Sequence, residues 1–173
     1  MSDLTLLSVD RLVIRPVCAE DLPALEWDGQ YTAYRFVFRD TFEDAQQGRR
    51  IMLVAAVDAK MVGQVFVQLS SSDTRFADGA TRGYLYALRV RPLWRGQGVG
   101  ARLIAAAEAA LRARGFTTAV IAAVKDNTGA ARLYQRMGYR IFAEDAGEWS
   151  FTDADGNEQS IAEPCWVMEK RLE

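Results

Sequence analysis

Three glycines at alternate positions, Gly96, Gly98 and Gly100, are the residues whose types and spacing most clearly suggest chemistry. They lie between an alternating apolar segment at 83–90 and an alanine- and leucine-rich segment, an order that predicts a strand, a turn and a helix. The first amide N–H groups of such a helix have no partner within it, and the helix dipole favours negative charge there. Without Cβ atoms the turn lets an anion approach those amides closely, so the pattern indicates a pyrophosphate site with Arg95 at its rim. The alternative is a tight turn that only packs the helix against the strand.

The same glycines also fit the alanine variant of the dinucleotide-binding pattern, Gly96-x-Gly98-x-x-Ala101, with Asp126 after the next predicted strand. Here, however, the pattern follows three or more predicted strands, and too little sequence comes after it for a second nucleotide-binding half. We therefore expect a phosphate-binding turn outside the dinucleotide-binding fold.

The composition excludes several kinds of site. The chain has no histidine, so histidine-based triads, histidine-ligated metals and imidazole bases are excluded. Cys18 and Cys165 lack metal-ligand spacing, which predicts reduced core thiols. Residues 153–158, DADGNE, open like a calcium loop but have glutamate at the sixth position and proline at the twelfth, so we predict no metal site.

Charge and hydropathy exclude two classes of partner. The net charge of −2 gives no overall attraction for nucleic acid. No segment approaches the roughly 18 apolar residues that a membrane-spanning helix needs, and the amino-terminal stretch has no leader pattern. We therefore expect a cytoplasmic protein with no nucleic acid and no membrane as partners.

The rest of the sequence supplies the elements that must position the glycine turn. Alternating or continuous apolar runs predict strands at 11–17, 51–57, 61–69, 83–90, 117–124, 139–144 and 165–172. Helical spacing predicts helices from residue 19, within 27–50, from the glycines to a cap at Gly115, and over 127–137. In the strand at 83–90, the period of two places Tyr86, Leu88 and Val90 on one face. A chain of 173 residues is enough for one buried core and short for two, so we expect a single domain over 1–173.

Two segments resemble the signatures of the GNAT superfamily of acyl-CoA-dependent N-acyltransferases. Residues 88–104, LRVRPLWRGQGVGARLI, resemble a strand ending in a Val-x-Pro-like step followed by Arg/Gln-x-x-Gly-x-Gly/Ala, here Arg95, Gly98 and Gly100. Residues 127–139, NTGAARLYQRMGY, resemble Asn-x-x-Ala-x-x-x-Tyr followed by Gly-aromatic, here Asn127, Ala130, Tyr134, Gly138 and Tyr139. Both occur in the family's order, within a motif-bearing core of about 83–142.

The resemblance implies an α/β (α+β) fold with a mixed, partly splayed sheet flanked by helices, and acetyl-CoA as cosubstrate. The pyrophosphate is expected on the amides of residues 95–100, and the pantetheine arm beside the strand, paired with the backbone of Leu88 and Val90. The residues expected to bind acetyl-CoA are Leu88, Val90, Arg95, Gly96, Gln97, Gly98, Val99, Gly100, Asn127, Ala130 and Tyr134. Taken alone, Asn127 is also explained as a helix N-cap and Tyr134 as a core aromatic.

The implied reaction is acetyl transfer to a primary amine of a small molecule or peptide. Tyr134 is expected to act as general acid. A phenol with a pKa of about 10 is protonated at neutral pH, whereas a thiol with a pKa of about 8.5 leaves as a thiolate that can accept a proton. Many relatives carry a glutamate on the strand before the glycines, but this strand has Tyr86 and Ala87 there. The carboxylates considered instead are Glu144, Asp145, Glu148 and Glu163, which are equally explained as surface acids, so no base is assigned.

An aromatic cluster falls where the family's first helices wall the acceptor pocket. Its members are Trp27, Tyr31, Tyr34, Phe36 and Phe38, with Glu26 or Asp28 placed to attract an ammonium group. Core packing explains these aromatics equally well. The alternative to an enzyme is a non-catalytic CoA-binding or partner-recognition module of the same fold, and the resemblance also allows a homodimer.

Overall fold

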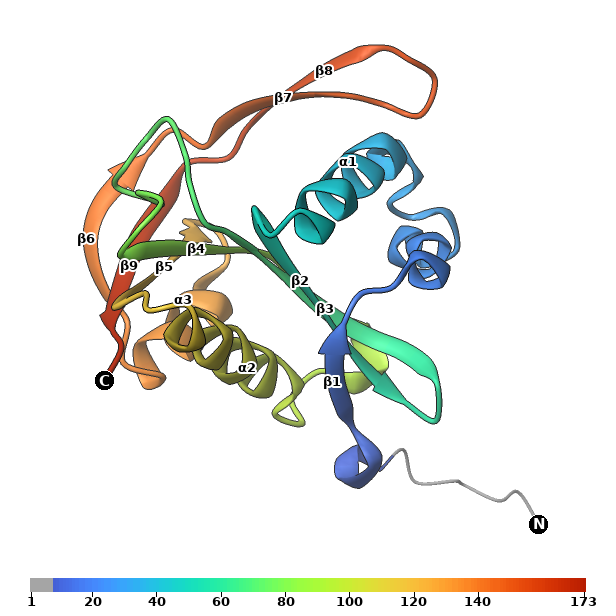
Figure 1. Cartoon of the computed structure of the whole chain (residues 1–173), viewed down its shortest axis with the longest axis horizontal. Helices are drawn as coiled ribbons and strands as arrows, with labels where there is room; N and C mark the ends of the chain where they lie inside the picture. The colour runs from blue at the N-terminus through green and yellow to red at the C-terminus, as the bar shows by residue number, and fades with distance from the viewer. Residues whose placement is uncertain (1–7) are drawn as a thin grey trace.

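A seven-stranded mixed sheet forms the centre of the computed structural model, which describes residues 8–173 (Figure 1). The first seven residues, part of the amino-terminal stretch without a leader pattern, lie outside the described residues. In sheet order the strands are β1 (Val13–Pro16), β2 (Arg50–Val57), β3 (Lys60–Gln68), β4 (Arg82–Val90), β5 (Thr118–Val124), β9 (Cys165–Arg171) and β6 (Arg140–Asp145). Neighbours are antiparallel except β4 and β5, which are parallel. The predicted mixed α/β sheet is confirmed, and it is not the parallel sheet of a dinucleotide-binding fold.

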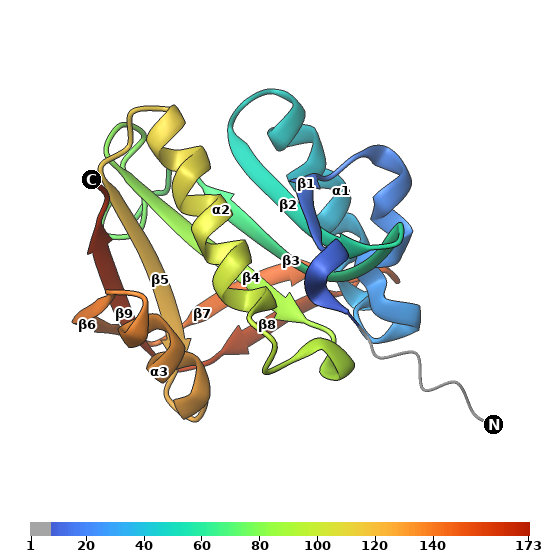
Figure 2. The same ribbon diagram turned by 90° about the horizontal axis from the view of Figure 1, so that it is seen from below.

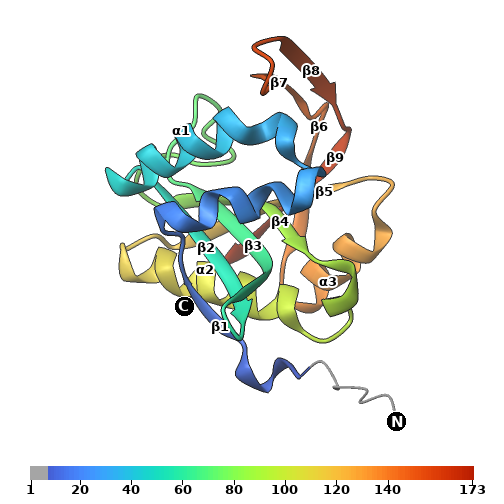
Figure 3. The same ribbon diagram turned by 90° about the vertical axis from the view of Figure 1, so that its right-hand side faces the viewer.

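Helices cover both faces of this sheet (Figures 2 and 3). Helices α2 (Val99–Ala113) and α3 (Thr128–Arg136) lie on one face, and α1 (Arg35–Gln46) lies on the other with the 3-10 helix η2 (Ala19–Gly29). The described helices also include three short 3-10 helices: η1 (Val9–Arg11), η3 (Thr32–Tyr34) and η4 (Pro92–Trp94). No helix within residues 8–173 has both the length and the apolar character needed to cross a membrane.

The local signals around α2 predict its structure well. Its apolar stripe, Leu103, Ile104, Ala107 and Leu111, is 0% exposed. Gly115 follows the helix with a φ of +82°, a left-handed conformation that glycine adopts without strain. Both cysteines are free, but the prediction of core thiols holds only for Cys165, because Cys18 is exposed before η2.

The prediction that Tyr86, Leu88 and Val90 share one face of β4 is wrong. Tyr86 pairs with Phe66 and Arg89 pairs with Gln64, so two residues of β4 oppose one residue of β3. The bulge residue Ala87 has a φ of +51°. This extra residue reverses the alternation: Tyr86 packs against the η2 and α1 side, whereas Leu88 and Val90 pack against the α2 side. Arg89 consequently faces η2 and α1.

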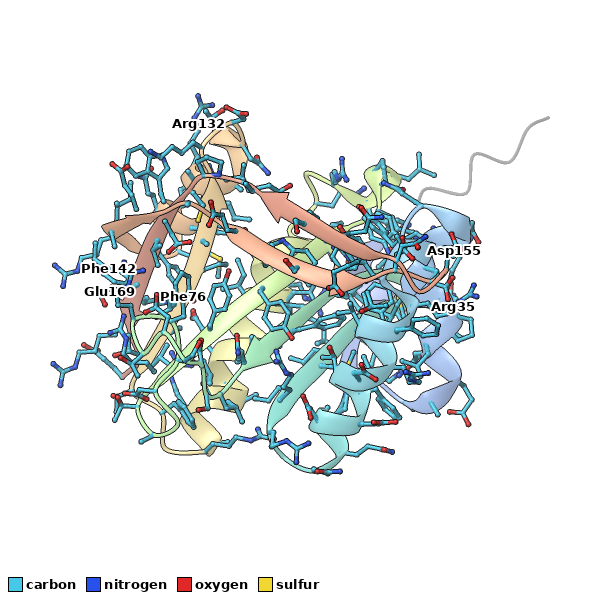
Figure 4. The ribbon with its side chains drawn as sticks, turned by 90° about the horizontal axis from the view of Figure 1, so that it is seen from above. Arg35, Phe76, Arg132, Phe142, Asp155 and Glu169 are labelled. Carbon is cyan, nitrogen blue, oxygen red and sulfur yellow. The ribbon has the colours of Figure 1, made fainter. Side chains whose placement is uncertain are left out.

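The connection between β6 and β9 contains two strands that the sequence pattern did not predict. These strands, β7 (Glu148–Thr152) and β8 (Glu158–Ala162), pair with each other in a separate sheet. Their hairpin projects from the β6 and β9 side of the molecule toward α1, and its tip at Asp155 lies at the same end as Arg35 (Figures 1 and 4). Within the hairpin strands only Phe151 is buried, so the apolar signal was weak.

Gly147 at the base of this hairpin is expected to be irreplaceable. Its φ is +66°, and a Cβ at this position would lie 2.0 Å from the carbonyl oxygen of Glu163. We expect Gly147→Ala to lower the free energy of unfolding by about 3 kcal/mol, because left-handed strain adds to a clash with backbone. For a chain of this size, that loss corresponds to a decrease in Tm of roughly 6 to 12 °C.

The matched control is Gly156→Ala at the tip of the same hairpin. Gly156 has a φ of +86° but no atom within 4 Å of an added Cβ. This variant carries the strain without the clash and should lose only about 1 kcal/mol. Thermal unfolding followed by circular dichroism measures both, and equal Tm values for the two variants would contradict the expectation.

Candidate active site

The glycine turn between β4 and α2 leaves the helix start open. Gly96 and Gly98 have φ values of +72° and +84°, and no atom lies within 4 Å of a Cβ added to either. Gly98 is the N-cap of α2 and offers no side chain to its first amides. Gly100 differs, because its Cβ would meet Leu133 at 3.5 Å and Val90 at 3.8 Å. Gly96 and Gly98 therefore leave the start of α2 open, and Gly100 permits close packing between α2 and its neighbours.

Strands β4 and β5 separate beside this turn. Their pairing runs from Arg82 with Thr118 to Leu85 with Ile121, although both strands continue beyond it. The amide of Arg91 donates to the carbonyl of Val62 on β3 at 2.8 Å. Because successive residues direct their backbone groups to opposite edges of a strand, those of residues 88 and 90 face β5. An extended chain can pair with this edge of β4, which is the splay that the resemblance implied.

Side chains of the turn bond back to its own backbone. Arg95 is exposed, and its Nε donates to the carbonyl of Val90 at 2.9 Å. Gln97 Nε2 donates to the carbonyl of Leu93 at 3.0 Å. Arg95 thus occupies one backbone group of Val90 that faces β5, while its two Nη groups stay at the rim of the turn.

The second motif lies on α3, next to the glycine turn in space. Asn127 caps this helix, since its Oδ1 accepts from the amide of Ala130 at 3.0 Å. Ala130 is half-buried and packs against the α2-side core. Tyr134 is 7% exposed in the same core. Burial raises the pKa of Tyr134 to about 12, and no hydrogen-bond partner among residues 8–173 offsets that effect.

Tyr84 on β4 lies on the opposite face of the sheet from Tyr134. Tyr84 packs with Phe76, at 4.9 Å between ring centroids, on the face away from α2. Burial raises the pKa of Tyr84.

On the α1 side, most of the predicted aromatics form one cluster. The ring of Tyr34 lies 6.2 Å from Tyr31 and 6.1 Å from Phe38, and Tyr31 lies 5.2 Å from Trp27. The hairpin adds Trp149 and Phe151, at 5.8 and 4.7 Å from Tyr34. Phe36 is outside this set of ring contacts and lies under Arg39, at 4.9 Å. The sequence pattern did not predict the hairpin's contribution to this wall.

The carboxylates considered for acceptor binding differ in their surroundings. Glu26 accepts two hydrogen bonds from Arg35, at 2.8 and 3.0 Å, and these lower its pKa. It is therefore held in an ion pair. Asp28 is exposed and faces Arg91 at 3.4 Å.

Two of the four carboxylates considered as bases are held in ion pairs as well. Glu144 pairs with Lys125 at 2.8 Å, and Asp145 pairs with Arg75 at 3.0 Å. Glu148 and Glu163 are exposed. Within residues 8–173, no group of three or more Cys, Asp or Glu side chains is arranged to hold a metal ion.

Two polar residues on the α1 side were missed by the sequence reasoning. Gln64 and Arg89 face each other across the ladder between β3 and β4. Both side-chain amide atoms of Gln64 and Nη1 of Arg89 are buried without a hydrogen-bond partner in the described part of the chain. A glutamine within the apolar run 61–69 was the available signal.

Comparison with known proteins decides the family. The model of the Acetyltransferase (GNAT) family matches residues 19–139. The chain belongs to the GNAT family. No curated protein matches its sequence.

Solved structures agree with this GNAT assignment in their fold. Ard1 from Thermoplasma volcanium superimposes with a TM-score of 0.71 and 18% identity, over 94% of this chain and 99% of that one. The ribosomal-protein-S18-alanine N-acetyltransferase from Escherichia coli gives 0.66 and 21%, over 93% and 94%. The acetyltransferase yncA from Salmonella typhimurium, solved with its cofactor acetyl-CoA, gives 0.69 and 16%, over 94% of each chain. The predicted resemblance is confirmed.

Proposed function

We propose that this GNAT chain transfers an acetyl group from acetyl-CoA to a primary amine of a small molecule or peptide. The observation that carries the proposal is the juxtaposition of three features: the open glycine turn at the start of α2, the unpaired edge of β4, and the buried phenol of Tyr134. The first two fit the long, anionic and extended cosubstrate. The phenol of Tyr134 can supply the proton that the departing thiolate requires.

Backbone groups hold acetyl-CoA in this proposal. The amides from Gly96 to Gly100 donate hydrogen bonds to the oxygens of the pyrophosphate, and Arg95 adds positive charge. Backbone groups of Leu88 and Val90 pair with the pantetheine arm and polarise the thioester carbonyl. Further contacts with acetyl-CoA come from Gln97, Val99, Asn127, Ala130 and Tyr134.

Tyr134 supplies the proton for the leaving group. When the amine nitrogen attacks the thioester carbonyl carbon, the C–S bond breaks and its electron pair stays on sulfur. Tyr134 then donates its phenolic proton to that thiolate. The nitrogen loses one proton to solvent as the amide forms, and Tyr134 regains one from solvent, so the protons balance. With a pKa of about 12, the phenol remains protonated throughout the neutral range and is available as acid.

The absence of an assigned base favours a weakly basic acceptor. An α-amine with a pKa of about 7.7 to 8.0 needs roughly 1 to 1.4 kcal/mol to become neutral at pH 7, whereas a lysine-like amine needs about 4.6 kcal/mol. The Escherichia coli neighbour is named for the alanine of ribosomal protein S18. A peptide α-amine is one acceptor class within this proposal.

Thiol release from acetyl-CoA with a panel of amines tests the proposed function. We expect release that depends on the added amine, together with heat from CoA binding in calorimetry. Tight CoA binding without turnover across a broad panel would identify a CoA-binding module instead. No heat from CoA at millimolar concentration would overturn both.

A further inference from the structure

An arginine on the acceptor side of the sheet has a buried group without a partner. Nη1 of Arg89 is buried and makes no hydrogen bond within residues 8–173. Directly across the ladder, Gln64 is 0% exposed, and neither its amide nitrogen nor its amide oxygen is bonded. Buried polar groups in proteins nearly always have partners, and a charged group loses most without one. The unpaired donors, Nη1 of Arg89 and Nε2 of Gln64, and the unpaired acceptor, Oε1 of Gln64, therefore point to a ligand.

The surroundings of Arg89 favour an anion. Its guanidinium lies over the ring of Tyr31 at 4.0 Å and over that of Tyr34 at 5.6 Å. Burial lowers the pKa of Arg89, and no carboxylate in the described part of the chain forms an ion pair with it. A guanidinium stacked on aromatic rings presents a planar fork that matches a carboxylate.

A neighbouring arginine in similar surroundings shows the contrast. Arg91 lies over the ring of Trp27 at 5.1 Å. Its Nε donates to the carbonyl of Met61 at 3.1 Å, and its Nη1 pairs with Asp28 at 3.4 Å. The protein itself thus satisfies Arg91, whereas Nη1 of Arg89 has no partner within residues 8–173.

We infer that the acceptor amine carries a carboxylate, which Arg89 binds with Gln64 as an additional hydrogen-bonding group. The inference rests on the proposed acetyl transfer and names its acceptor class, primary amines that bear a carboxylate. Arg89 lies between residues 88 and 90, whose backbone is proposed to align the thioester, and it faces the aromatic wall.

Matched acid and amide acceptors test this inference. The value of kcat/KM is measured for 4-aminobutanoate and for glycylglycine, each against its carboxamide, at pH values that give equal fractions of neutral amine. We expect the acids to be preferred about tenfold or more, as for a lost hydrogen bond to a charged group. Arg89→Gln should reduce this preference to about one, whereas the matched control Arg91→Gln should retain it. Equal kcat/KM for acids and amides in the native protein would overturn the inference.

A binding experiment separates this inference from the proposed reaction. Calorimetry compares N-acetyl-4-aminobutanoate with its carboxamide in the presence of CoA, so it needs no turnover. Tighter binding of the acid that Arg89→Gln abolishes supports the site even if no amine releases thiol. Thiol release with acids and amides alike, and equal binding of both, removes the site and keeps the reaction. If Arg89→Gln does not fold, Arg89→Lys keeps the charge without the fork and should lose most of the preference.

Discussion

Tyr134→Phe is expected to lower kcat for acetyl transfer by about 100- to 1,000-fold, the usual contribution of a general acid. The phenyl ring preserves the packing of α3 against the core, so the Kd for acetyl-CoA should change little. What is lost is the proton for the departing thiolate, which then leaves without a donor. Steady-state thiol release gives kcat, and calorimetry gives Kd.

Tyr139→Phe is the matched control for this variant. Tyr139 is also buried, and its ring lies 6.4 Å from that of Tyr134, but its hydroxyl donates to Glu108 at 3.2 Å. Glu108 keeps two hydrogen bonds from Lys170 when that hydroxyl is removed. This variant should lose about 1 kcal/mol of stability and no catalysis. Full turnover by Tyr134→Phe with acetyl-CoA bound would remove Tyr134 as the acid.

The pH profile offers a separate check on Tyr134. Because burial raises its pKa to about 12, its protonated, active form is lost only as the pH rises through that value. The protonated form of an ordinary phenol would be lost around pH 10, roughly its usual pKa. We therefore expect kcat/KM to rise as the amine loses its proton and then to stay level up to pH 10. A fall between pH 8 and pH 10 would show that the acid has an unshifted pKa.

The sequence predicted features that depend on local interactions. The start of α2 follows from glycines before an apolar stripe, and its end follows from Gly115, because both signals lie within a few residues of the structure that they specify. Asn127 at the N-cap of α3 is another such feature. The assignment of the acetyl-CoA contacts, the single domain over 1–173, the cytoplasmic location and the homodimer stay predictions.

Features that depend on distant pairing were missed. The bulge at Ala87 arises where β4 pairs with β3, and an alanine carries no local signal for a left-handed residue. The register between β3 and β4 is needed to see that Arg89 lies opposite Gln64 and that Arg89 faces η2. The β7–β8 hairpin was missed for a different reason, since most of its side chains are exposed and the alternation of apolar residues is weak.

Gly98→Ala is expected to raise the Kd for CoA by about 100-fold, equivalent to losing roughly one or two hydrogen bonds to a charged phosphate. A methyl group at this position points into open space beside the first amides of α2, where the proposed pyrophosphate lies. The left-handed φ of +84° also adds strain, so the variant should lose about 1 kcal/mol of stability.

Gly115→Ala separates strain from the loss of the site. Gly115 lies just beyond the other end of the same helix, has a φ of +82°, and likewise has no atom within 4 Å of an added Cβ. The two variants therefore carry equal backbone strain and should unfold at similar temperatures, whereas only Gly98→Ala should weaken CoA binding in calorimetry. Because backbone strain and open space are matched, any difference in the Kd for CoA comes from the contact of the added methyl group with the bound pyrophosphate. Unchanged Kd values in both variants would mean that the helix start carries no pyrophosphate, and the glycines would then serve only the turn and its packing.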